Sequence, residues 1–70
     1  MSGETLRIQI NGDLEQIPAP ATVASLVALR RPRPPFAVEV NRQLVRRTQY
    51  ESTNLRDGDQ VEIVTLVGGG

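Results

Sequence analysis

Three consecutive glycines, Gly68, Gly69 and Gly70, close the chain directly after an apolar run that is typical of a β-strand. Glycine has no Cβ, so such a tail can take backbone conformations closed to other residues. Its α-carboxylate has an ordinary pKa of about 3.3 to 3.7 and is ionised at neutral pH. We interpret the carboxylate of Gly70 as the candidate reactive group, with a frayed chain end as the alternative.

Few other side chains could do chemistry. The sequence has no His, no Cys and no Lys, because all eight basic residues are arginine. It therefore lacks an imidazole base, a thiol nucleophile, a Schiff-base amine and a thiolate metal site. Compositional bias would also explain the missing lysines. We expect no catalytic residues, no metal site and no bound cofactor, and hence a protein on which other enzymes act.

Length and charge bound the remaining possibilities. With 70 residues the chain is expected to form a single domain over residues 1–70, with a flexible tail at 68–70. Eight acidic and eight basic residues give a net charge of zero, so no long-range attraction to nucleic acid or to an anionic membrane is expected. No signal peptide or spanning segment is evident, which makes the cytoplasm the expected location.

The first half of the sequence predicts a hairpin and a helix. Apolar residues alternate over residues 6–10, Asn11 and Gly12 suit a two-residue hairpin turn, and residues 13–17 form the returning strand. Thr22 can cap a helix that runs to about Arg31, because Pro32 disfavours helical geometry in the residue before it. The proline-rich segment at 30–35 is interpreted as a connector.

The second half predicts further strands at 36–40, 44–45 and 61–67, with Asp57-Gly58 as a turn and Leu55 as a core anchor. The fold class is therefore α+β: a mixed four- to five-stranded sheet with one main helix packed on one face. The predicted core consists of Leu6, Ile8, Ile10, Ile17, Val23, Leu26, Val27, Phe36, Val38, Val40, Leu55, Val61 and Ile63.

The last predicted strand is apolar on both faces. If Val61 and Ile63 face the helix, Val64 and Leu66 point to the opposite side, together with Arg7, Gln9 and Val45. Val64, Leu66 and Val45 are therefore the candidate docking surface for a partner, beside the tail. The alternative is a β-bulge that returns one of these residues to the core.

These residues resemble the ThiS family of sulfur carriers from thiamine biosynthesis, which have a ubiquitin-like β-grasp fold. The resemblance spans nearly the whole chain. It is strongest over Val38-Glu39-Val40-Asn41 with Leu44-Val45, over Leu55-Arg56-Asp57-Gly58-Asp59-Gln60-Val61-Glu62-Ile63-Val64, and over the ending Val67-Gly68-Gly69-Gly70.

The resemblance implies a carrier chemistry for the tail. A ThiF-like enzyme would use ATP and Mg²⁺ to adenylate the Gly70 carboxylate, and a persulfide sulfur donor system would convert the adenylate into a thiocarboxylate. A ThiG-like thiazole synthase would then receive the sulfur. Gly68 and Gly69 would thread the partner active sites, where a Cβ would clash.

Three alternatives remain open. The small subunit of molybdopterin synthase ends in the same diglycine and carries the same thiocarboxylate. A noncovalent β-grasp binding module would not need Gly70 at all. A modifier conjugated to lysines of target proteins would appear as higher-mass adducts.

Overall fold

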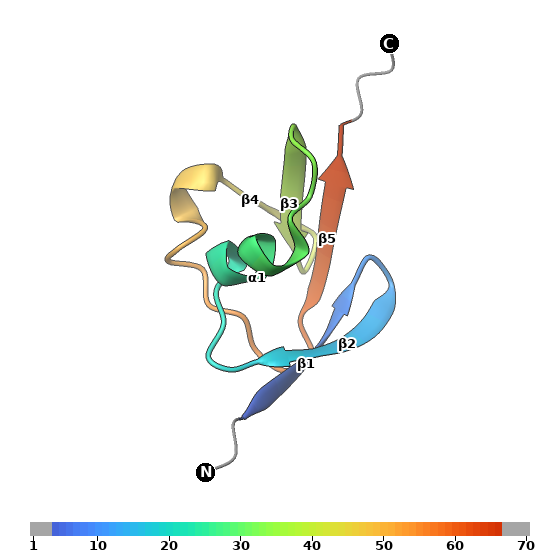
Figure 1. Cartoon of the computed structure of the whole chain (residues 1–70), viewed down its shortest axis with the longest axis vertical. Coiled ribbons are helices and arrows are strands. Elements are labelled where there is room, and N and C mark those ends of the chain that lie inside the picture. Colours follow the sequence, from blue (N-terminus) through green and yellow to red (C-terminus); the bar gives the residue numbers. More distant parts are fainter. Residues whose placement is uncertain (1–3, 67–70) are drawn as a thin grey trace.

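The structure, a computed structural model, describes residues 4–66 (Figure 1). This part of the chain folds into five β-strands, one α-helix and a single turn of 3₁₀ helix. The elements in chain order are β1 (Thr5–Ile10), β2 (Asp13–Pro18), α1 (Val23–Arg30), β3 (Phe36–Val40), β4 (Gln43–Val45), the 3₁₀ turn η1 (Arg47–Gln49) and β5 (Gln60–Thr65).

The strands form one mixed sheet in the order β2-β1-β5-β3-β4. The central strand, β5, is parallel to β1, whereas the other neighbouring strands are antiparallel. The helix α1 follows β2 in the chain and lies across one face of this sheet (Figure 1). The α+β fold predicted from the sequence, with one helix on a mixed sheet, is therefore confirmed.

Both hairpins turn on residues with positive φ. Asn11 and Gly12 have φ values of 53° and 88°, and Asn41 and Arg42 have values of 51° and 69°. Two successive positive φ angles match the twist of the flanking strands in a two-residue hairpin, and asparagine tolerates this region well. The first turn was predicted. The second was expected to span residues 41–43, between the predicted strands at 36–40 and 44–45, and it is one residue shorter because Gln43 already belongs to β4.

Thr22 starts the helix, as predicted. Its hydroxyl accepts a hydrogen bond from the Ser25 N–H at 3.1 Å, and the Ser25 hydroxyl accepts one from the Thr22 N–H at 2.9 Å. This capping box satisfies backbone N–H groups that a helix start leaves free. Arg31 ends the helix in the left-handed region at φ 50°, and its N–H donates to Val27 O at 2.8 Å. The Pro32 that follows does not continue the helix.

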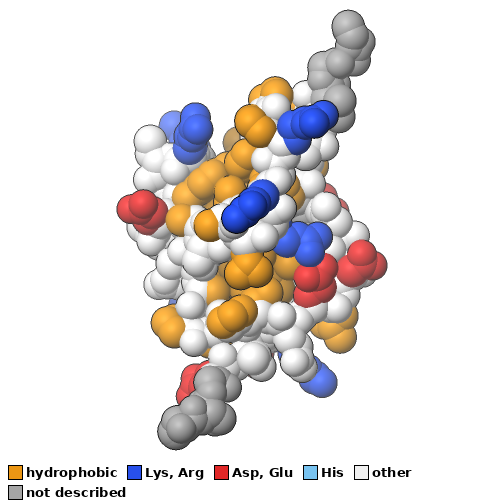
Figure 2. Space-filling view, in the orientation of Figure 1, with side chains coloured by type: hydrophobic (Ala, Val, Ile, Leu, Met, Phe, Trp, Pro, Cys, Tyr) orange, Lys and Arg blue, Asp and Glu red, His pale blue; other side chains and the backbone are white. Residues whose placement is uncertain are grey.

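The core lies between α1 and the sheet face that it covers. Viewed from the side of α1, hydrophobic side chains gather along the middle of the molecule with arginines among them (Figure 2). Four predicted core residues are only partly buried, and two residues left out of the prediction, Ala21 and Val45, are buried. The buried set is Ile8, Ile10, Ile17, Ala21, Val23, Leu26, Val38, Val45, Leu55, Val61 and Ile63, with Leu6, Val27, Phe36, Val40 and Tyr50 packed against it.

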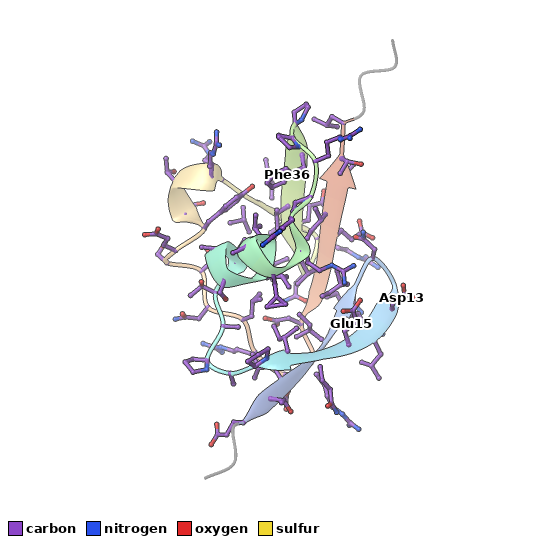
Figure 3. All side chains as sticks on the ribbon, viewed as in Figure 1. Asp13, Glu15 and Phe36 are labelled. Carbon is purple, nitrogen blue, oxygen red and sulfur yellow. The ribbon has the colours of Figure 1, made fainter. Side chains whose placement is uncertain are left out.

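An ion pair joins the helix to the edge of the sheet. The Arg30 guanidinium lies 2.9 Å from the carboxylate of Glu15 on β2, which Figure 3 shows near α1. Both side chains are about one-third exposed, and such a pair contributes at most about 1 kcal/mol in water. Within residues 4–66, the Arg30–Glu15 pair is the one salt bridge.

Candidate functional site

The candidate reactive residue, Gly70, and the candidate threading residues, Gly68 and Gly69, lie outside the described residues, so their roles stay predictions. The described chain ends at Leu66, whose N–H donates to Pro35 O at 2.8 Å. This bond holds the end of β5 beside the start of β3, where Phe36 lies (Figure 3). The base of the tail is therefore fixed to the sheet up to its last described residue.

Two asparagine side chains fix the position of β5 from both sides. The Asn11 amide donates to Ile63 O at 3.2 Å and accepts from the Ile63 N–H at 2.8 Å. Asn41 accepts from the Gln60 N–H at 3.0 Å, and its amide nitrogen donates to a carboxylate oxygen of Asp59 at 3.0 Å. The sequence indicated both asparagines only as turn residues, because partners many positions away are not visible in a local pattern.

The sheet face opposite α1, called the outer face below, carries the side chains that alternate with the core residues of each strand. It displays apolar and charged groups together. By strand register its members include Arg7, Gln9, Leu14, Gln16, Ala37, Glu39, Leu44, Gln60, Glu62 and Val64.

Val64 points to this outer face and is 45% exposed, and Leu66, one residue beyond β5, is 53% exposed. Ala37 lies opposite Val64 in the register between β3 and β5. No bulge returns Val64 to the core, since the pairing from Phe36–Thr65 to Val40–Val61 is continuous. Their exposure agrees with the expected placement, and their role in docking a partner stays a prediction.

The expectation for Val45 was wrong. Val45 is 8% exposed and lies opposite Val38, which is fully buried, so its side chain belongs to the core. Its neighbour Leu44 is 65% exposed and occupies the outer face instead. The cause is register: the two-residue turn at Asn41-Arg42 sets the pairing of β4, and a change of one residue moves a side chain to the opposite face of a sheet.

A pair of carboxylates on the outer face was missed. Glu39 on β3 lies directly opposite Glu62 on β5. Beside them is a hollow of about 220 Å³, whose lining also includes Gln9, Arg42 and Gln60. The sequence indicates which face each Glu occupies, since each alternates with core valines or isoleucines. The pairing of the two residues depends on the order of the strands.

An apolar groove runs from the outer face around the β4 edge of the sheet. It has a volume of about 550 Å³, and its lining includes Phe36, Leu44, Tyr50 and Arg47. The groove extends the exposed apolar surface of Leu44 toward the segment that precedes β3. Pro34 and Pro35, at the end of the predicted connector, also line it.

Residues 4–66 contain no group of three or more His, Cys, Asp or Glu side chains placed to hold a metal ion. In the same range, no helix is both long and apolar enough to cross a membrane.

Comparison with known proteins gives the family. The model of the ThiS family matches residues 8–70. The chain belongs to the ThiS family of sulfur carriers. The match runs from the second half of β1 through the helix, the second hairpin, β5 and the three glycines, and it agrees with the resemblance found in the sequence.

The chain is also similar to a solved structure and to several curated proteins. A crystal structure of the thiamine biosynthesis protein ThiS from Geobacter metallireducens superposes with a TM-score of 0.79 at 25% identity, covering 93% of this chain and 100% of that one. Uncharacterized protein ycf40 of Porphyra purpurea is 35% identical over 71 aligned positions, covering all of both chains. A thiazole synthase of Paramagnetospirillum magneticum is 35% identical over 66 positions, which are 93% of this chain and 20% of that protein.

Proposed function

We propose that this ThiS-family chain carries sulfur for thiazole formation in thiamine biosynthesis as a thiocarboxylate on Gly70. The observation that carries the proposal is the family match, which extends through the three terminal glycines. The described structure supports it by fixing the base of the tail at Leu66 on an exposed apolar surface. No side chain of this protein is assigned a catalytic role.

The proposed chemistry takes place at the terminal carboxyl carbon. One carboxylate oxygen attacks the α-phosphorus of ATP in a ThiF-like enzyme, with Mg²⁺ present, and pyrophosphate leaves. The terminal sulfur of a persulfide then attacks the acyl carbon and AMP leaves, which gives an acyl disulfide. A thiol cleaves the S–S bond of that disulfide and releases the thiocarboxylate. In this series of reactions the carrier is a substrate at each step.

Thiazole synthase is the proposed acceptor of the sulfur. A segment similar to this chain forms about a fifth of the thiazole synthase from Paramagnetospirillum magneticum, so in that protein both parts belong to one polypeptide. This arrangement favours the thiazole branch over the molybdopterin branch, which shares the thiocarboxylate. The proposal assigns the chain to the cytoplasm, where ATP is available and thiols are kept reduced.

The test is intact-mass measurement after incubation with a ThiF-like enzyme, ATP, Mg²⁺ and a persulfide donor. We expect the mass change that replaces one oxygen by one sulfur, and no change in a variant lacking Gly70. The control is the chain incubated without ATP. Absence of the mass change with an enzyme that is active on another ThiS-family carrier would overturn the proposal in favour of a binding module.

A further inference from the structure

The outer face contains an unfavourable arrangement of charge. Glu39 and Glu62 are register partners on adjacent antiparallel strands, a position that places Cβ atoms about 4.5 to 5.5 Å apart. Like charges at such positions destabilise a sheet. Within residues 4–66 neither carboxylate forms an ion pair with an arginine, because the salt bridge found there joins Arg30 to Glu15. The fold alone gives no reason for this pair.

The surroundings of the pair are apolar on one side. Leu44 lies opposite Glu39 across the β3–β4 ladder and is 65% exposed, and Val64 follows two residues after Glu62 on β5. A protein that covers these apolar groups would also remove water from the two carboxylates. Burying an unpaired charge is costly, so such a partner must supply an opposite charge at this point.

The hollow beside the pair has room for the head of a long side chain. Its volume is about 220 Å³, and Gln9 and Gln60 add polar groups to its lining. Arg42, from the β3–β4 turn, is the cationic group of this chain in that lining. One positive and two negative charges leave the hollow with a net negative charge, which complements an arginine or lysine on a partner.

The length of the tail keeps the partner within reach of this face. Gly70 is four residues beyond Leu66, and four residues span at most about 14 Å when fully extended. An enzyme that reacts with Gly70 therefore lies against the end of β5. Glu62 is four residues before Leu66 on the same face, about 13 Å away along the strand. A standard interface of about 800 Å² per partner is large enough to include both positions.

We propose that the Glu39–Glu62 pair receives an arginine or lysine side chain of the adenylating enzyme, which docks on the outer face over Leu44, Val64 and Leu66. This inference rests on the proposed function, because it takes as partner the enzyme that acts on the tail. The apolar residues supply contact area, and the carboxylate pair fixes the position of the partner and selects it by charge. Arg42 competes with the incoming cation.

The test measures adenylation kinetics and binding with carboxamide variants. In ATP–pyrophosphate exchange catalysed by the ThiF-like enzyme, we expect Glu39→Gln plus Glu62→Gln together to raise the KM for the carrier about tenfold with little change in kcat. The dissociation constant, measured with no ATP present, should rise by a similar factor. Added salt should weaken wild-type binding more than binding of the double variant.

Two controls separate docking from folding. Glu51→Gln removes an exposed carboxylate from the segment after η1 and should leave the KM unchanged. Arg42→Asn keeps a residue that tolerates positive φ while removing the competing cation, so it should lower the KM. Thermal unfolding gives a further readout. The double variant should melt at a higher temperature than wild type and yet bind the enzyme more weakly. A purely structural role of the two carboxylates would not raise stability and weaken binding at the same time.

The outcomes distinguish this inference from the proposed function. A double variant that binds and is adenylated like wild type overturns the inference and leaves the carrier role intact. Weakened binding to thiazole synthase alone overturns the assignment to the adenylating enzyme. A wild-type chain that neither binds the active enzyme nor supports exchange overturns both.

Discussion

The two faces of β5 show how one strand serves two purposes. On the side of α1, Val61 and Ile63 are 1% and 9% exposed and belong to the core. On the outer face, Val64 is 45% exposed and Glu62 faces another carboxylate. The inner face has the packing expected of a stable domain, whereas within residues 4–66 the outer face has exposed apolar groups and two carboxylates that form no ion pair. The difference indicates that the inner face maintains the fold and the outer face is available for binding.

The largest expected effect comes from truncating the inner face. Ile63→Ala removes buried methyl and methylene groups and should lower the free energy of unfolding by about 2 to 5 kcal/mol. Val64→Ala, the next residue on the exposed side, is the matched control and should change it by no more than about 0.5 kcal/mol. Urea denaturation measures both. Equal losses would contradict the contrast between the faces.

A smaller loss is expected where β5 is held in place. Asn11→Ala removes two hydrogen bonds to the Ile63 backbone. It also places an alanine at φ 53°, a backbone conformation that asparagine tolerates better than alanine does. We expect the free energy of unfolding to fall by about 1 to 3 kcal/mol. Asn11→Gly tolerates this φ angle and loses only the side-chain bonds, so it separates the two contributions. If denaturation shows Asn11→Ala as stable as wild type, the side chain does not hold β5.

The smallest effect, of opposite sign, concerns the outer face. Glu62→Gln removes one charge from the carboxylate pair while keeping the shape of the side chain. We expect it to raise the free energy of unfolding by about 0.2 to 1 kcal/mol, because like charges across a ladder repel. The gain should shrink in high salt, which screens exposed charges. Denaturation at two salt concentrations checks this, and a loss of stability would show that Glu62 has a favourable partner.

Much of the fold could be predicted because its information is local. The Asn11-Gly12 turn, the alternation of Ile8 and Ile10, and the cap at Thr22 each depend on residues within a few positions of one another. Their structures follow from backbone sterics and from the periods of strands and helices. The ThiS family was likewise evident from contiguous residues, including those from Leu55 to Val64.

Predictions that depended on register or on strand order were less successful. Val45 was assigned to the outer face because the exact length of the turn before β4 was not evident. The Glu39–Glu62 pair and the bonds from Asn11 to Ile63 were missed because their members are 23 and 52 positions apart. The two carboxylates, and likewise Asn11 and Ile63, are brought together only because β5 lies between β3 and β1 in the sheet.

The sequence by itself determined the class of fold, the hairpin and helix boundaries to within a residue or two, the family, and the tail as the candidate reactive segment. These features depend on residue type and short-range spacing, which sterics and hydrophobic periodicity translate directly into local structure. The tertiary structure decided which face of the sheet each β4 side chain occupies, how β5 is held, and that two carboxylates oppose each other beside an apolar surface. Such features depend on contacts between strands distant in sequence, whose order and register are set by packing of the whole core.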